Sequence, residues 1–440
     1  MSTTHDAGPW PIPIAPGPLH ARIQVPGSKS ETNRALVIAA LSEDPSTIRG
    51  GLDARDTRLM RDALRALGVA VEEQPGQWLV TPPDRFTAAP VPINCGLAGT
   101  VMRFVPPLAA LAVGRTVFVG DPEASHRPLS PLLDGLALLG ATVEGNTIPC
   151  AVTGPEMLEG REVTIDSSGS SQFISGLLLV GARLPNGLVL RHRAPDSSEP
   201  PSRPHLDMTV AMLREHGVQV TETEPGLWQV LPGPVVAVDQ LVEPDLTSAA
   251  VYLAAAAIAG GSVTVAGWPR ETTQPGDMVR EVLARMGADV ALRDGELMAT
   301  GTGDLHAVDI DLHEASELTP VVAALAALAT GRTTIRGVAH IRGHETNRLE
   351  ALEAELRRVG VQAEQTADGL VVEGVGLTGE GLHAADFRSY ADHRIVHTAV
   401  LLGLVVDGCT VDDVACTSKT INDFDQSWQQ MLSGSQEVDR

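Results

Sequence analysis

Two helix patterns alternate along the chain. The first is amphipathic, with apolar residues spaced for a helix, and it runs into a glycine and then into alternating residues typical of a strand. It occurs five times, in segments 59–73, 129–145, 208–222, 278–292 and 349–365. A glycine at that position is typical of a helix C-cap, and the five are Gly68, Gly140, Gly217, Gly287 and Gly360. We therefore predict five surface helices, each followed by a strand.

The second pattern is apolar on nearly all sides and rich in small residues, which is typical of a buried helix. It occurs six times, in segments 34–41, 102–114, 171–184, 248–261, 319–331 and 393–408, and a short β-branched run follows each copy. The repeating unit is therefore about seventy residues long, with one buried helix, one surface helix and several strands. Six such units in 440 residues fit an α/β protein of two domains with three units each. The boundary is expected near Val242–Asp245, and the residues before Pro26 supply a crossing strand.

The composition is that of a soluble globular chain, with 43% hydrophobic and 20% charged residues. No stretch approaches the roughly 20 apolar residues of a membrane span, and the first residues lack the features of a signal peptide. The net charge of −23 argues against a nucleic-acid or membrane partner. The four cysteines have neither metal-site nor disulfide-scaffold spacing, so we expect a reducing, cytoplasmic setting.

Basic residues occur where the buried helices begin, notably at Lys29, Arg34, Arg103 and Arg394. N-capping explains the Ser, Thr and Asp residues found there, but a cation at a helix N-terminus opposes the helix dipole. The cation is favourable if an anion lies between it and the free backbone N–H groups. The sequence therefore predicts an anion-binding cavity. Only two of the 32 basic residues, Lys29 and Lys419, are lysines.

Seven motifs at these places resemble those of the enolpyruvyl transferases, and among them the 5-enolpyruvylshikimate-3-phosphate synthases. In chain order they are PGSKSETNRAL, GLAGTVMR, HRPLSPLLDGL, SSQF, RGHETNRL, DHR and CTSKT, and they extend from Val25 to Asp423. The resemblance implies two similar domains, each of three βαβαββ units in an inside-out α/β barrel, with the active site in the interdomain cleft. The domains would be residues 27–244 and, discontinuously, 1–26 with 245–440.

The implied reaction transfers the enolpyruvyl group of phosphoenolpyruvate to the 5-hydroxyl of shikimate 3-phosphate, by addition and then elimination of phosphate. It belongs to chorismate and aromatic amino-acid biosynthesis. The resemblance implies no metal or organic cofactor, small molecules as the only partners, and a monomer.

The resemblance also implies roles for individual residues. In shikimate 3-phosphate binding they are Lys29, Ser30, Arg34, Ser170, Ser171, Gln172 and Ser202. In phosphoenolpyruvate binding they are Lys29, Gly99, Thr100, Arg127, His344, Arg348, Arg394 and Lys419. Glu317 would take the proton of the 5-hydroxyl, and Glu345 would deliver a proton to the methylene carbon, with His344 and Lys29 as alternative donors.

The chain departs from the usual pattern at five positions. Glu317 and His344 stand where many members have Asp and Lys, so His344 is expected to make the site pH-sensitive. Leu97, Asn347 and His205 replace a common Asn, Asp and Tyr.

Two alternatives remain open on the sequence alone. A transferase acting on UDP-N-acetylglucosamine would share the repeat, but segment 114–127 lacks the cysteine usual in that branch. A non-catalytic protein that binds a phosphorylated metabolite would gain nothing from carboxylates in its site. Phosphate release from phosphoenolpyruvate discriminates among the three.

Overall fold

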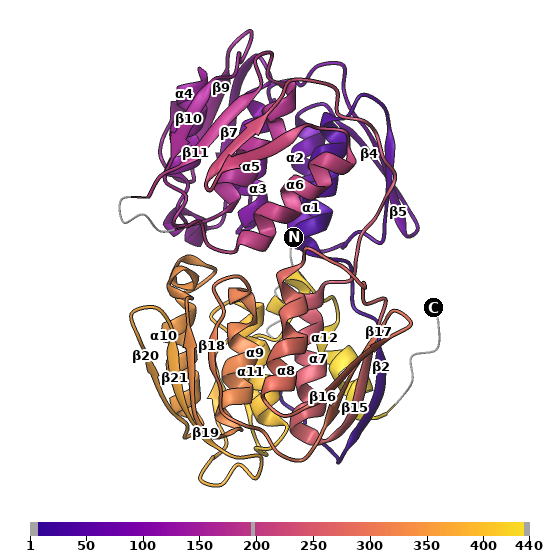
Figure 1. The fold of residues 1–440 in the computed structure, drawn as a ribbon, viewed down its shortest axis with the longest axis vertical. Coiled ribbons are helices and arrows are strands. Elements are labelled where there is room, and N and C mark those ends of the chain that lie inside the picture. Colours follow the sequence, from indigo (N-terminus) through magenta and orange to yellow (C-terminus); the bar gives the residue numbers. More distant parts are fainter. Residues whose placement is uncertain (1–7, 195–198, 435–440) are drawn as a thin grey trace. The chain divides into compact units, whose positions relative to one another are not determined.

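The computed structural model describes residues 8–194 and 199–434, which form two compact units (Figure 1). Unit 2 is Gly27–Glu243, and unit 1 combines the residues up to Pro26 with those from Pro244 onward. The chain therefore passes between the units twice, at Pro26–Gly27 and at Glu243–Pro244. Among the described residues, no helix combines the length and the apolarity that crossing a bilayer requires.

Unit 2 contains three copies of one βαβαββ arrangement. The first copy is β14 (Gln240–Leu241), α1 (Lys29–Leu41), β3 (Ser46–Arg49), α2 (Arg55–Ala66), β4 (Ala70–Gln74) and β5 (Gln77–Thr81). The second is β6 (Ile93–Asn94), α3 (Gly99–Ala109), β7 (Gly114–Val119), α4 (Ser130–Leu139), β8 (Thr142–Glu144) and β9 (Cys150–Gly154). The third is β10 (Glu162–Ile165), α5 (Gln172–Val180), β11 (Leu188–His192), α6 (Arg203–Glu215), β12 (Val220–Glu224) and β13 (Leu227–Val230).

Unit 1 repeats the arrangement. Its first copy is β2 (Leu19–Ile23), α7 (Leu246–Ala259), β15 (Gly261–Ala266), α8 (Val279–Arg285), β16 (Asp289–Arg293) and β17 (Glu296–Gly301). Its second is β18 (Asp309–Asp311), α9 (Thr319–Ala327), β19 (Thr330–Arg336), α10 (Arg348–Arg358), β20 (Gln362–Gln365) and β21 (Leu370–Val375). Its third is β22 (Asp386–Phe387), α11 (His393–Gly403), β23 (Thr410–Val411) and α12 (Phe424–Leu432), with β1 (Trp10–Pro11).

The sheets share one topology. In the five four-stranded sheets, an edge strand runs parallel to its neighbour, and two antiparallel strands follow, as in the order β18-β19-β21-β20. The remaining sheet has the order β1-β23-β22. The first copy of each unit takes its edge strand from a distant part of the chain, because β14 pairs with β3 and β2 pairs with β15. The predicted α/β class and repeat are confirmed.

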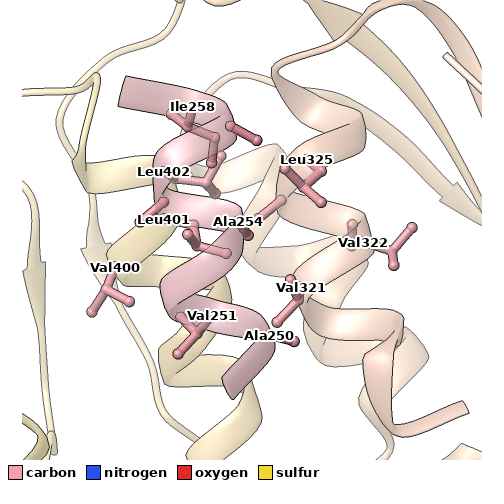
Figure 2. Close-up of a cluster of buried hydrophobic side chains, with 14 of the residues drawn as sticks. Ala250, Val251, Ala254, Ile258, Val321, Val322, Leu325, Val400, Leu401 and Leu402 are labelled. Atoms are coloured by element: carbon pink, nitrogen blue, oxygen red, sulfur yellow. The ribbon is translucent and has the colours of Figure 1, made fainter. Parts of the chain in front are cut away.

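The buried and surface helices are those the two patterns predict. Helices α1, α3, α5, α7, α9 and α11 are buried along nearly their whole length. The five predicted C-cap glycines all have positive φ, between 76° and 110°, a conformation that glycine adopts without steric cost. In unit 1 the apolar side chains of α7, α9 and α11 gather where these helices meet (Figure 2). Side chains along α7, α9 and α11 therefore hold these three helices in one packed core.

Candidate active site

The first turn of α1 is tied to α6 by a buried arginine. Arg34 is 1% exposed, and its Nε donates to Thr209 Oγ1 at 2.7 Å. Its Nη1 donates to the carbonyl of Ser30 at 2.9 Å, and its Nη2 to the carbonyl of His205 at 3.0 Å. Arg34 therefore holds the two helices together, and it fixes the backbone beside Lys29.

The start of α3 lies against two guanidinium groups. Arg127 is buried, and its Nη1 donates to the carbonyl of Leu97 at 2.9 Å. A Cβ added to Gly99 would lie 2.9 Å from Arg103 Nη1 and 3.1 Å from Arg127 Nη2. Thr100 Oγ1 accepts a hydrogen bond from Asn33 Nδ2 of α1 at 2.8 Å. The missing side chain at Gly99 is thus what lets the two cations approach the helix N-terminus.

The loop before α5 contributes hydroxyl and amide groups. Ser170 Oγ accepts from the backbone N of Gln172 at 3.3 Å, and Gln172 Oε1 accepts from Arg103 Nη1 at 2.9 Å. Ser171 is buried and precedes the helix directly. Ser202 precedes α6 in a left-handed conformation, with φ 54°, and its carbonyl accepts from the backbone N of His205. Helices α1, α3, α5 and α6 pack on one another, so these groups belong to one side-chain cluster of unit 2.

Positive charge exceeds negative charge at these helix starts. Lys29 Nζ lies 3.7 Å from Asp56 Oδ2, and both side chains are largely buried. Burial, together with the nearby Glu243 carboxylate, raises the pKa of Glu31 to about 8, so this acid is mostly protonated at neutral pH. The cations at these helix starts are Lys29, Arg34, Arg103 and Arg127, and the carboxylates described beside them are Asp56 and, next to Glu31, Glu243. This side-chain cluster suits an anionic ligand.

Unit 1 brings together a second cluster, centred on Arg348. The Arg348 side chain is 1% exposed; its Nε donates to Asp392 Oδ2 at 2.7 Å, and its Nη2 donates to Glu345 Oε2 at 2.8 Å. The second oxygen of Glu345 accepts from Lys419 Nζ at 2.5 Å. Arg394 Nη2 donates to Glu317 Oε2 at 2.9 Å. The predicted proton-transfer carboxylates therefore each contact a predicted anion-binding cation.

The expectation that His344 makes the site pH-sensitive is wrong. Burial, reinforced by the charge of Arg348, holds the pKa of His344 well below its ordinary value. Arg348 Nη1 lies 2.9 Å from His344 Nδ1, and because arginine can only donate, Nδ1 is the acceptor and the proton lies on Nε2. Burial likewise lowers the pKa of the neighbouring His340 to about 4. His344 is therefore a neutral hydrogen-bond donor through Nε2.

Two acidic residues of these clusters, Asp392 and Asp56, are not among the predicted site residues, and Arg103 is predicted only as a cation at a helix start. Asp392 caps α11, accepting from the backbone N of Arg394 at 3.0 Å, and it binds Arg348 through both oxygens. Arg103 donates a hydrogen bond to Gln172, and Asp56 lies beside Lys29. The DHR motif of the sequence contains Asp392, but the resemblance implies a role only for its arginine.

The comparisons with known proteins agree with the class that the motifs and the repeat define, the enolpyruvyl transferases. A family model for EPSP synthase (3-phosphoshikimate 1-carboxyvinyltransferase) matches residues 14–428. The chain is 48% identical over 435 residues to a 3-phosphoshikimate 1-carboxyvinyltransferase of Kocuria rhizophila, with 96% of each chain covered. The chain therefore belongs to the EPSP synthase family.

Solved structures share the fold. One EPSP synthase structure from Acinetobacter baumannii matches with a TM-score of 0.77 at 24% identity, covering 97% of this chain and 98% of that one. A second EPSP synthase structure from the same organism matches with a TM-score of 0.73 at 25% identity, covering 92% and 94%.

Proposed function

We propose that this protein transfers the enolpyruvyl group of phosphoenolpyruvate to the 5-hydroxyl of shikimate 3-phosphate, and that it does so as a cytoplasmic monomer. Residues 27–244 would form one enolpyruvyl-transferase domain, and residues 1–26 with 245–440 the other. The observation that supports this most directly is the pairing of Glu317 with Arg394 and of Glu345 with Arg348 and Lys419. A site that only binds anions has no use for these carboxylates, because they neutralise its cations.

The two side-chain clusters suit different parts of this chemistry. The positive excess in unit 2 suits the phosphate of shikimate 3-phosphate, held by Lys29 and Ser30 with Ser170, Ser171, Gln172 and Ser202, while Arg34 positions the first turn of α1. Gly99, Thr100 and Arg127 would receive phosphoenolpyruvate. In unit 1, by contrast, Arg348, Arg394 and Lys419 are matched by Glu317, Glu345 and Asp392. A phosphoenolpyruvate anion would compete with these carboxylates for the cations.

A cation that turns to phosphoenolpyruvate would leave its carboxylate partner available for proton transfer. In the addition step, the 5-hydroxyl oxygen bonds to C2 of phosphoenolpyruvate while the methylene carbon gains a proton. Glu317 would accept the hydroxyl proton once Arg394 turns to the ligand. His344 is a poor proton donor, because it is neutral and its Nε2 proton is only weakly acidic. Glu345 and Lys29 therefore remain the candidates for protonating the methylene carbon; Glu345 would pass on a proton received from Lys419, its hydrogen-bond partner. In the elimination step, the methyl group would return a proton to the group that delivered it, while the bond from C2 to the phosphate oxygen breaks and phosphate leaves.

The test is phosphate release from phosphoenolpyruvate, measured in parallel with shikimate 3-phosphate and with UDP-N-acetylglucosamine. We expect release with the first acceptor alone. Release with the second alone would overturn the acceptor assignment, and binding of either without release would favour a non-catalytic protein. Sedimentation velocity tests the monomer.

A further inference from the structure

The loop before α11 contains two consecutive residues in a conformation that side chains disfavour. Tyr390 has φ 54° and Ala391 has φ 53°, both in the left-handed region, and neither is glycine. The next residue is Asp392, which binds Arg348 and caps the helix carrying Arg394. A loop with such a conformation persists only where its surroundings hold it, so the contacts of the loop decide where Asp392 lies.

Two carboxylates from other elements hold the backbone of this loop. The N–H of Arg388 donates to Glu355 Oε2 at 3.1 Å, and the N–H of Ser389 donates to Asp412 Oδ1 at 2.8 Å. The N–H groups of Ala391 and Asp392 donate to the side chain and the carbonyl of Ser389, respectively. The loop therefore closes on itself through Ser389, and it is anchored from outside by Glu355 and Asp412.

Glu355 is a buried acid that the proposed reaction does not use. It is 1% exposed, and its carboxylate also accepts from the hydroxyl of Tyr390 at 2.8 Å and from Arg358 Nε at 3.0 Å. Burial, reinforced by Glu355, raises the pKa of Tyr390 to about 12, so this hydroxyl stays a donor. Two of the three hydrogen bonds to Glu355 thus come from the disfavoured loop.

Helix α10, which carries Glu355, holds the loop at a second point through Arg348. Glu355 and Arg348 both lie on α10, seven residues or about two turns apart, and therefore on the same side of the helix. Arg348 contacts Asp392, and Glu355 contacts Arg388 and Tyr390. The helix thereby sets both the position of Asp392 and the conformation of the residues that lead to it.

We propose that Glu355 is a positioning residue for the phosphoenolpyruvate-binding cations: it holds Tyr390 and Ala391 in the left-handed conformation, so that Asp392 keeps Arg348 and Arg394 in place. This inference rests on the proposed function. It assigns Glu355 no contact with either substrate.

The test compares Glu355→Gln with Glu353→Gln. The amide at 355 replaces one acceptor oxygen by a donor group, so it cannot accept all three hydrogen bonds. Glu353 is the matched control, because it lies on the same helix and contacts Gln365 and Arg357 rather than the loop. We expect Glu355→Gln to raise the KM for phosphoenolpyruvate about tenfold, with the KM for shikimate 3-phosphate within about twofold of the wild type. Glu353→Gln should change neither.

Two further variants separate positioning from folding. Tyr390→Phe keeps the ring and the Glu355 charge but removes one donor, and it should raise the KM for phosphoenolpyruvate about threefold. Adding Ala391→Gly to Glu355→Gln should recover much of the loss, because glycine adopts positive φ without help. The proposal would be overturned if neither Glu355→Gln nor Tyr390→Phe changed the KM for phosphoenolpyruvate, or if they raised the KM of both substrates equally.

The proposed function can fail separately. If the wild type releases no phosphate with shikimate 3-phosphate, amide hydrogen exchange over residues 388–394 replaces the kinetic readout. Faster exchange in Glu355→Gln than in Glu353→Gln would then support the role of Glu355, and equal exchange in the two variants would refute it.

Discussion

Gly99→Ala is the substitution whose effect the structure defines most sharply. The added methyl would lie 2.9 Å from Arg103 Nη1, and 3.1 Å and 3.2 Å from the two terminal nitrogens of Arg127. These distances are shorter than ordinary contacts, so one or both guanidinium groups must shift by a few tenths of an ångström. The backbone accepts the change, because Gly99 is the first residue of α3 and is not among the glycines with positive φ. We therefore expect a protein that folds normally with a displaced anion site.

The size of the effect follows from the number of hydrogen bonds lost. A hydrogen bond to a charged group contributes about 1.5–3 kcal/mol. Losing one such bond from Arg127 to phosphoenolpyruvate corresponds to a rise of about 10- to 150-fold in its KM. Shikimate 3-phosphate is expected to contact the starts of α1 and α5, which the methyl reaches only indirectly, through Arg103 and Gln172, so its KM should rise less than that of phosphoenolpyruvate.

Steady-state phosphate release with each substrate varied in turn measures both constants. Gly233→Ala is the control, because a Cβ there meets nothing within 4 Å and the residue lies in the same unit. The reasoning is refuted if Gly99→Ala binds phosphoenolpyruvate as well as the wild type does. A melting temperature well below that of the control would also contradict it, since the methyl would then disturb the helix rather than the cations.

Three other substitutions test separate parts of the structure. His397 is fully buried, and burial, together with nearby arginines, lowers its pKa to about 3. The folded protein therefore protonates His397 less readily than the unfolded chain does. The free energy of unfolding consequently falls as the pH drops through 6.5 toward 3. His397→Met should remove about 2 kcal/mol of the stability lost between pH 7 and pH 5 in urea titrations, whereas exposed His306→Gln should not. Asn347 caps α10 by accepting from the backbone N of Glu350, so Asn347→Ala should cost about 1 kcal/mol in urea titrations and leave kcat unchanged; a large fall in kcat would show that this residue serves the reaction. Leu325→Ala in the core of Figure 2 should cost about 2–5 kcal/mol, and a smaller shift of the urea midpoint would mean that the helices there collapse to fill the space.

The fold was predictable from sequence because its information is local and repeated. A C-cap glycine such as Gly217 and an all-apolar helix such as α7 can each be recognised within a short window, and the repeat makes each copy support the others. The edge strands of the first copies were harder. Strand β14 has two residues and pairs with β3, far away in the chain, so no local pattern predicts it.

For the candidate site, the sequence predicts which types of residue gather there but not their protonation states or contacts. The cations at the helix starts conflict with the helix dipole, and that conflict is visible in sequence. The state of His344 was not, because its neutrality comes from burial and from Arg348, four residues further along. Glu355 was invisible for a related reason: within an amphipathic helix an acid reads as a surface residue, and only the tertiary structure shows that it is buried against a loop.

The scarcity of lysine gains a physical reading from these contacts. Thirty of the 32 basic residues are arginines, whose guanidinium group binds phosphate well but does not release a proton near neutral pH. The two lysines lie next to buried carboxylates, Lys29 beside Asp56 and Lys419 beside Glu345. The ammonium group is also a compact point charge, whereas the guanidinium group is a planar fork of donors. If the site requires the compact charge, Lys29→Arg and Lys419→Arg should lower kcat for phosphate release although the charge is kept, and an unchanged kcat in both variants would refute this.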